Sequence, residues 1–271
     1  MRAPEQAQTQ EIAGVILAAG KSSRMKELGL EKNKTALPGP DGKSLIVTAV
    51  ELFQRKTDPV VVVIGSTPES YPDSVQRSLA EQEEVLFASV DSDQSGTGHS
   101  FATGVKFLAN SGYSPDAVVL GHGDNLMRIP GEVFDGFIEF CKTEQPTIGL
   151  VTAMHPDPTN SSAGKIARDT EGNVAGIVEK KDATPEQRKL DEINFGLYCM
   201  SYLWTLKNID TIPPSPATGE IYATELVRMA IEQGEYVQTY EIDYALVGND
   251  VNTPADYQTL LQSGNSATLT N

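Results

Sequence analysis

The chain has 271 residues, of which 39% are hydrophobic and 21% charged, so it is long and apolar enough to bury a substantial core. Its net charge of −16 argues against a nucleic-acid-binding surface, and no apolar run is long enough to cross a membrane. Residues 1–10 are too polar for a signal peptide, and Cys141 and Cys199 lack the CxxC spacing of a zinc site. We therefore expect a cytoplasmic protein with two reduced core cysteines and with neither nucleic acid nor membrane as a partner.

The first half of the chain alternates between predicted strands and predicted helices. After a polar segment at residues 1–10, the expected elements are a strand at 12–18, a helix that begins after Ser44, a strand at 59–65, a polar helix at 71–82, a strand at 85–89, a helix that opens within 96–100 and runs to about 110, a strand at 117–120, a helix at 131–143 and a strand at 147–153. Such alternation predicts an α/β fold with a doubly wound, mostly parallel, Rossmann-like sheet.

The rhythm changes in the second half. Strands near 164–168, 173–179 and 193–200 follow one another without long helices, which predicts a mixed, partly antiparallel extension of the sheet. A helix at 220–232, a strand at 236–241 and a helix near 254–262 complete the fold, and residues 263–271 have the polar composition of a flexible tail. We find no internal repeat.

The stretch from Gly14 to Met25 has the character of a phosphate-binding loop. An apolar strand stops at Ala18-Ala19-Gly20, and small residues, one lysine and one arginine follow. A Walker A motif is excluded because five residues, not four, separate Gly14 from Gly20. Gly42-Lys-Ser44 fails the same test, since Leu37 stands where the first glycine belongs.

Leu17-Ala-Ala-Gly-Lys-Ser-Ser-Arg-Met25, followed by Lys34-Thr-Ala-Leu-Pro38, resembles the signature of sugar nucleotidyltransferases, L-A-[AG]-G-x-G-[ST]-R-M/L and then P-K. The resemblance implies that Leu17, Ala18, Ala19 and Gly20 bind the nucleotide. It also implies that Arg24 and Lys34 act as catalytic cations on the phosphates. Ser22 stands where that family has glycine and Asn33 where it has proline, and Lys26 and Lys32 compete with Lys34 for its role.

Three further segments resemble the same family. Gln94-Ser-Gly-Thr-Gly-His99 resembles its Q-x-G-T-G-H element, and Gly121-His-Gly-Asp124 resembles its G-D element. Asp250-Val-Asn-Thr253 resembles its G-V-N-N element. The resemblance implies that Mg²⁺ is held by Asp124 and Asn252, and that the nucleotide is bound by Gly96, Thr97, Gly123 and, at the position that reads the base, Asp91.

The stretch from Gly164 to Asn194 resembles bacterial N-acetylglucosamine-1-phosphate uridylyltransferases without a gap. In that family the corresponding residues contact the amino sugar, which implies a sugar-binding role for Gly164, Glu179 and Asn194. Gly219-Glu-Ile-Tyr-Ala-Thr-Glu-Leu226 resembles the family's N-E-Y-Y-x-T-D-I element.

The resemblance implies one nucleotidyltransferase domain at 11–262, with a nucleotide-binding part at about 11–125 and a sugar-binding part at about 126–262. It stops before the left-handed β-helical acetyltransferase domain with which the family's bifunctional members continue, and we expect no such domain in this chain.

The activity implied by the resemblance is transfer of a nucleotidyl group from a nucleoside triphosphate to a sugar 1-phosphate, with Mg²⁺ as cofactor and release of pyrophosphate. UTP and N-acetylglucosamine 1-phosphate are the first choices. Asp91 leaves CTP or dTTP open, because a carboxylate accepts from a base but does not donate. Two alternatives remain: a cytidylyltransferase for a non-sugar phosphate on the same fold, and a non-catalytic nucleotide-sugar sensor. The sequence does not predict the oligomeric state.

Overall fold

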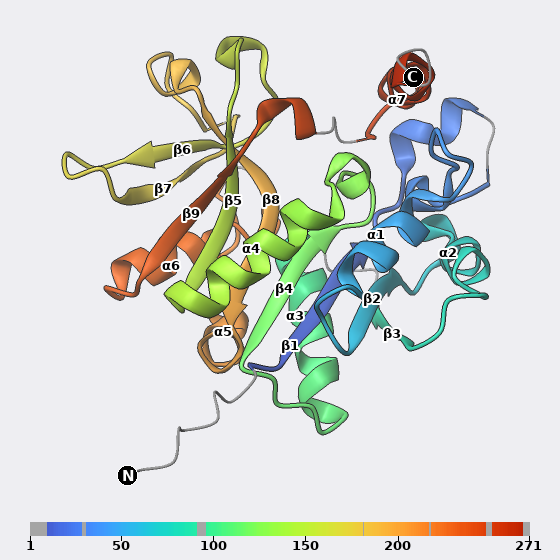
Figure 1. Cartoon of the computed structure of the whole chain (residues 1–271), viewed down its shortest axis with the longest axis horizontal. Coiled ribbons are helices and arrows are strands. Elements are labelled where there is room, and N and C mark those ends of the chain that lie inside the picture. The colour runs from blue at the N-terminus through green and yellow to red at the C-terminus, as the bar shows by residue number, and fades with distance from the viewer. Residues whose placement is uncertain are drawn as a thin grey trace.

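The computed structural model describes residues 10–28, 31–90, 96–180, 182–216, 218–247 and 251–267. Within them one open sheet carries the order β3-β2-β1-β4-β8-β5-β9, with β6 and β7 as a hairpin attached to β8 (Figure 1). The strands are β1 (Ile12–Ala18), β2 (Val60–Gly65), β3 (Val85–Val90), β4 (Ala117–His122), β5 (Ile148–Met154), β6 (Lys165–Arg168), β7 (Val174–Val178), β8 (Glu192–Ser201) and β9 (Val237–Ile242). The α-helices are α1 (Leu45–Phe53), α2 (Pro72–Ser78), α3 (Thr97–Asn110), α4 (Gly131–Glu144), α5 (Tyr202–Asn208), α6 (Glu225–Glu232) and α7 (Pro254–Ala267).

This arrangement confirms the predicted α/β fold with a mostly parallel sheet and a mixed extension. Strands β1 to β4 pair in parallel, as do β5 and β9, whereas β8 runs antiparallel to both β4 and β5. None of the helices in the described ranges is long and apolar enough to cross a membrane. Cys141 and Cys199 are free and buried, as the sequence predicts.

Four details of the sequence prediction are wrong. Helix α2 is shorter than 71–82, because Tyr71 takes a left-handed conformation and the chain turns back at Leu79. Helix α6 begins at Glu225 rather than at 220. Helix α5 was not predicted. The expected tail at 263–271 is helical to Ala267, while residues 268–271 and 1–9 lie outside the described residues.

The alternation of side chains along β1 explains why helices cover both faces of the sheet. Ile12 and Ile16 pack into a core that α1 and α4 complete. Val15 and Leu17 point to the other face, where α3 and α6 lie (Figure 1). A strand buried on both faces is the expected environment for a continuous apolar run.

The antiparallel direction of β8 brings its first residues to the edge of the sheet where β4 and β5 end. Thr152 pairs with Asn194 and Leu150 with Tyr198, so three residues of β8 oppose the single Val151 of β5. This bulge includes Gly196 at φ 88°, a left-handed value that favours glycine. Bulges of this kind re-aim neighbouring side chains, and here the neighbour is Asn194.

Helix α7, the last helix of the chain, lies beside the segment drawn in blue that includes the first loop (Figure 1). A small apolar cluster joins them, in which Val251 and Leu260 pack against Met25 and Leu37. The hydroxyl of Tyr257 also donates to the carbonyl of Pro38 at 2.9 Å. The segment that precedes α7 is thereby placed next to the first loop.

Candidate active site

Two adjoining cavities lie where β1, β4 and β5 end. The first, the loop cavity, has a volume of about 580 Å³ and includes Leu17, Ala18, Ala19, Gly20 and Gly96 in its lining. The second, the hairpin cavity, has a volume of about 590 Å³ and includes Gly164, Glu179 and Asn194. The residues that line both are Lys34, Thr97, His122, Asp124 and Tyr222. Ligands bound in the two cavities would therefore meet near Lys34 and Asp124.

Lys34 is the centre of this junction. Its ammonium Nζ lies 2.5 Å from Oδ2 of Asp124 and donates to Oδ1 of Asn252 at 3.0 Å. The Nη2 of Arg24 donates to the same Asn252 oxygen at 3.3 Å. The four residues that the resemblance assigned to catalysis and metal binding thus come together from four separate segments of the chain.

The geometry also bears on which lysine of the first region contacts phosphate. Lys34 is the first residue of the 3₁₀ turn η2 (Lys34–Ala36) and lines both cavities. Lys32 is exposed and lines neither cavity. The side chain of Lys26 lies outside what the structure describes. Lys34 is therefore the best-placed candidate.

Asp124 and Asn252 suit a divalent cation by their chemistry. A carboxylate and a carboxamide oxygen are the hard donors that Mg²⁺ prefers. Oδ2 of Asp124 is buried and accepts no hydrogen bond within the described residues, so its charge faces only the ammonium of Lys34. No group of three or more His, Cys, Asp or Glu side chains in the described ranges forms a metal cluster. Substrate phosphates or water would have to complete the coordination.

Asn252 is fixed by the start of α7. Oδ2 of Asp256 accepts from the backbone amides of Asn252 at 3.2 Å and Thr253 at 2.7 Å, while the hydroxyl of Thr253 accepts from the amide of Asp256 at 3.2 Å. This reciprocal pair is a capping box, readable from the T-x-x-D spacing. The sequence analysis missed Asp256, which also lines the hairpin cavity.

The segment with Gly96 and Thr97 forms the wall of the loop cavity at the start of α3. Gly96 has φ 103°, and a Cβ there would lie 2.1 Å from the carbonyl oxygen of Ile221. The hydroxyl of Thr97 accepts from the amide of Ala223 at 3.0 Å. Only glycine allows this close approach of the two backbones. The contacts hold the stretch before α6 against the start of α3, and that stretch does not continue helix α6 toward the N-terminus.

One of the predicted nucleotide-binding residues, Gly123, is placed differently, and the position of another is not described. Gly123 lines neither cavity, and its amide donates to the carbonyl of Leu17 at 3.1 Å, which joins the end of β4 to the end of β1. Asp91 lies outside the described residues.

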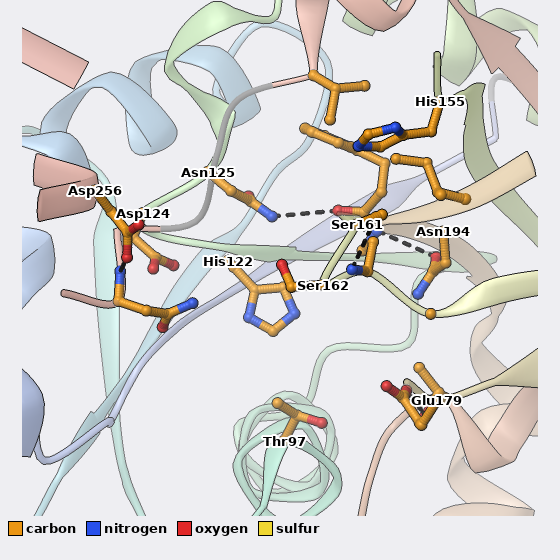
Figure 2. A pocket seen from close by; sticks show the side chains of 18 of the residues that line it. Thr97, His122, Asp124, Asn125, His155, Ser161, Ser162, Glu179, Asn194 and Asp256 are labelled. Carbon is orange, nitrogen blue, oxygen red and sulfur yellow. Dashed lines mark hydrogen bonds between the residues drawn. The ribbon is translucent and has the colours of Figure 1, made fainter. Parts of the chain in front are cut away.

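The hairpin cavity brings together the three predicted sugar-binding residues. The amide of Asn194 donates to the carbonyl of Gly164 at 2.9 Å, and a Cβ on Gly164 would lie 3.6 Å from Oε1 of Glu179. Thr224 donates to that same oxygen at 3.2 Å. Figure 2 shows Glu179 and Asn194 on one side of the cavity, Asp124 and Asp256 on the other, and His122 between them.

The carboxamide of Asn194 is oriented from behind by Tyr198. Its Nδ2 donates to the phenolic oxygen of Tyr198 at 2.6 Å, and its Oδ1 accepts from the amide of Gly196 at 3.2 Å. Tyr198 is 1% exposed, and burial raises its pKa above the ordinary value, so it stays a neutral phenol. Sequence reasoning missed Tyr198 because nothing in its position along β8 distinguishes it from a core residue.

The far wall of the hairpin cavity includes a histidine–tyrosine pair. Nε2 of His155 lies 2.9 Å from the hydroxyl of Tyr244. Burial and the positive charge of nearby Lys165 lower the pKa of His155, so the imidazole is neutral near pH 7. Among the described lining residues, Lys34 is the one lysine or arginine, whereas Asp124, Glu179 and Asp256 are acidic. Beyond the junction, the described lining therefore contributes no lysine or arginine to balance a negatively charged group.

Comparisons with known proteins place the chain in a family. The family model described as nucleotidyl transferase matches residues 13–261. The bifunctional protein GlmU of Pelobacter propionicus is 32% identical over 226 residues, which are 83% of this chain and 46% of the relative. The chain thus spans about half the length of that curated relative.

Solved structures share the fold at lower identity. A UDP-glucose pyrophosphorylase complexed with UDP-glucose has a TM-score of 0.71 at 17% identity, covering 97% of this chain and 100% of that one. A CMP:2-keto-3-deoxy-manno-octonic acid synthetase complexed with CTP has a TM-score of 0.70 at 15% identity, covering 95% of this chain and 99% of that one.

Proposed function

Because the chain belongs to the nucleotidyl transferase family, we propose that it joins a nucleoside triphosphate to a sugar 1-phosphate and releases pyrophosphate. The observation that carries the proposal is the junction of the two cavities at Lys34 and Asp124. Two substrates that react through their phosphates need separate pockets that share one phosphate-sized region. Holding both there converts a bimolecular encounter into an oriented, effectively unimolecular step.

In the proposed reaction, an oxygen of the sugar phosphate attacks the α-phosphorus of the triphosphate. The new P–O bond forms as the bond to the β-phosphate oxygen breaks, and the bonding electrons leave with pyrophosphate. No protein nucleophile is required, and none of the residues at the junction is a serine or cysteine. Catalysis then rests on positioning and on stabilising the charge that develops on the leaving group.

Arg24 and Lys34 are the cations available for that charge. Both line the loop cavity, and both already donate to Asn252, so small side-chain rotations would redirect them to phosphate oxygens. When present, Mg²⁺ held by Asp124 and Asn252 would neutralise phosphate charge and orient the two phosphates. Lys34 occupies the space between these two oxygens in the protein alone, so nucleotide and metal binding would have to displace it.

UTP and N-acetylglucosamine 1-phosphate are the substrates that we propose first. The resemblance between Gly164 and Asn194 supports the amino sugar, and the structure gathers Gly164, Glu179 and Asn194 at one place. An acidic side chain and a carboxamide suit the hydroxyl and acetamido groups of a neutral sugar. The lack of a second lysine or arginine in the described lining disfavours an acceptor that carries a carboxylate.

The two alternatives make different demands on the same site. A cytidylyltransferase for a non-sugar phosphate would use the loop cavity in the same way but would not need Glu179 and Asn194. A nucleotide-sugar sensor would not need a shared junction of cations and metal ligands. The gathering of Arg24, Lys34, Asp124 and Asn252 favours an enzyme over a sensor.

A pyrophosphate-release assay over the four common triphosphates separates these possibilities. Each triphosphate is combined with N-acetylglucosamine 1-phosphate, glucose 1-phosphate, a polyol phosphate, choline phosphate or no acceptor. We expect release only with an acceptor, fastest with UTP and N-acetylglucosamine 1-phosphate. Release only with CTP and a non-sugar phosphate would favour the first alternative, and silence with measurable nucleotide-sugar binding would favour the sensor.

A further inference from the structure

Asn33 is 1% exposed, and both ends of its carboxamide are hydrogen-bonded. Its Nδ2 lies within hydrogen-bond distance of the carbonyl oxygens of Ala18 at 3.1 Å, Gly20 at 2.9 Å and Ser70 at 2.9 Å. Its Oδ1 accepts from the amide of Thr35 at 3.0 Å and from its hydroxyl at 2.9 Å. One side chain therefore joins the first loop, the turn at Ser70 and the segment that carries Lys34.

The contacts to Ala18 and Gly20 help to fix which way the first loop presents its amides, beyond the pairing of Ala18 with Ile64 in the sheet. In a planar trans peptide the C=O of one residue and the N–H of the next point in opposite directions. Carbonyls that point at Asn33 therefore turn the N–H groups of Ala19 and Lys21 away from it. Both residues line the loop cavity, and their amides donate to no acceptor in the described part of the chain.

We propose that Asn33 is a positioning residue that orients the backbone of the first loop so that it binds the phosphates of the triphosphate. By holding two carbonyls, it fixes the orientation of the two N–H groups of Ala19 and Lys21, which line the loop cavity, and backbone amides of this kind make an anion-binding concavity. By holding Thr35, it fixes the adjacent Lys34 against the same loop. The inference rests on the proposed function, because it assumes that a triphosphate binds in this cavity.

The backbone conformation of Asn33 allows its side chain to be compared with that of a proline at the same position. Its φ of −63° and ψ of 142° are values that proline adopts, and proline is what the resembling family has at this position. A proline would fit these backbone values, but it would lose the ties to Ala18 and Gly20 and also the hydrogen bond that the amide of Asn33 donates to Oγ of Ser74 at 3.0 Å, which Asn33→Ala keeps. The carboxamide therefore adds hydrogen bonds to the first loop that the backbone conformation alone does not supply.

Ser22 makes a second tie between the same two segments. It adopts φ 50°, a left-handed value at which glycine is unstrained, and its hydroxyl accepts from the amide of Lys34 at 2.9 Å. Glycine there would relieve the strain but could not make this bond. The two departures from the family signature, Ser22 and Asn33, thus both link the first loop to the Lys34 segment.

The test measures triphosphate binding without acceptor, using calorimetric titration of the full chain with UTP, CTP and inorganic triphosphate in the presence of Mg²⁺. Variants Asn33→Ala and Asn33→Pro are compared with Asn208→Ala as a matched control. Asn208 is also a buried asparagine, bonded to the carbonyl of Trp204 and to Gln233, but it lines neither cavity. Steady-state KM values for both substrates complete the set.

We expect both Asn33 variants to weaken triphosphate binding by about tenfold or more, which is the order of effect of losing well-placed hydrogen bonds. The KM for the sugar phosphate should change by less than about twofold on the same scale. Asn208→Ala should lower the melting temperature and leave triphosphate affinity unchanged.

Wild-type affinity in Asn33→Pro would overturn the inference, because backbone shape would then suffice. If Asn33→Ala weakens the binding of triphosphate and raises the KM for sugar phosphate by the same factor, Asn33 has only a structural role. A wild-type chain that binds none of the three probes would instead overturn the proposed function, and this inference with it. If Asn33→Ala fails to fold, Ser22→Ala at its half-buried position tests the same linkage, and unchanged triphosphate affinity there would contradict it.

Discussion

The ammonium of Lys34 lies 2.5 Å from the carboxylate of Asp124, at the place where the loop cavity and the hairpin cavity meet. Lys34 follows the first loop and Asp124 follows β4, so the pair joins the two segments on which the proposed chemistry depends. Both side chains are largely withdrawn from water, at 20% and 6% exposure, which limits solvent screening of their attraction.

Substituting Lys34 by alanine should lower turnover by about two to three orders of magnitude, because a positive charge that stabilises the developing pyrophosphate is lost. The measurement is kcat at saturating substrates. Lys32→Ala is the matched control, since Lys32 is exposed and lines neither cavity, and it should behave as wild type. A Lys34→Ala variant with unchanged kcat would remove Lys34 from the mechanism.

Substituting Asp124 by asparagine should weaken the dependence of activity on Mg²⁺, because a charged hard donor becomes a neutral one. Binding of Mn²⁺ to the free chain, followed by electron paramagnetic resonance, should weaken as well. Lys34→Ala should move that affinity in the opposite direction, since it removes the cation that now faces Asp124. A metal titration of Asp124→Asn that matches wild type would contradict the assignment.

Replacing Tyr198 by phenylalanine should raise the KM for the sugar phosphate by about three- to tenfold, because Nδ2 of Asn194 loses its acceptor and the carboxamide is no longer oriented. The KM for the triphosphate should stay the same. Tyr202→Phe is the control, since Tyr202 is equally buried but bonds to the carbonyl of Tyr113 and lines neither cavity, whereas Tyr198 lines the hairpin cavity. If both KM values rise together in Tyr198→Phe, the residue supports the fold and not the sugar site.

The ion pair between Arg55, after α1, and Asp135, in α4, should contribute to the acid sensitivity of the fold. Hydrogen bonds from Arg55, at 3.0 and 2.6 Å, hold the pKa of Asp135 below its usual value of 3.8. A carboxyl with a depressed folded pKa contributes stability that is present above its unfolded pKa and is lost as the pH falls through the folded value.

Urea unfolding of the wild type should therefore show stability falling below about pH 5, and Asp135→Asn should make that fall less steep. Arg55→Gln should act in the same direction, because it removes the other half of the pair. The effect is small, since Arg55 is 46% exposed and solvent screens the pair. Parallel pH curves for wild type and Asp135→Asn would contradict this account.

The sequence predicted well those strands of the sheet that are continuous apolar runs. The apolar run of β1 stops at the small residues of the first loop, and β2 and β4 are equally continuous. Helix α6 was predicted too long because its first residues are held elsewhere: the carbonyl of Ile221 accepts from the amide of Gly98, and the amide of Ala223 donates to Thr97. Tertiary contacts of this kind override local helix preference.

In the candidate site, too, some residues were predicted from local motifs, and others are recognised only in the folded chain. Local motifs pointed to Lys34, Asp124 and Asn252 separately, but only the packing of α7 on the first loop brings Asn252 to the other two, across 218 residues of sequence from Lys34. No spacing rule gives that contact. Tyr198 and Asn33 were not predicted as functional, since each acts on a neighbouring group from a buried position, and burial at that position depends on the folded chain.

The most direct test of the central claim is the stereochemical course at the α-phosphorus. The chain is supplied with N-acetylglucosamine 1-phosphate and one diastereomer of UTP that carries sulfur on the α-phosphate, and the configuration of the nucleotide-sugar product is determined by phosphorus NMR. A single displacement across the junction of the two cavities predicts inversion. Retention would require a nucleotidyl group held covalently on the protein between two displacements, and would contradict the account.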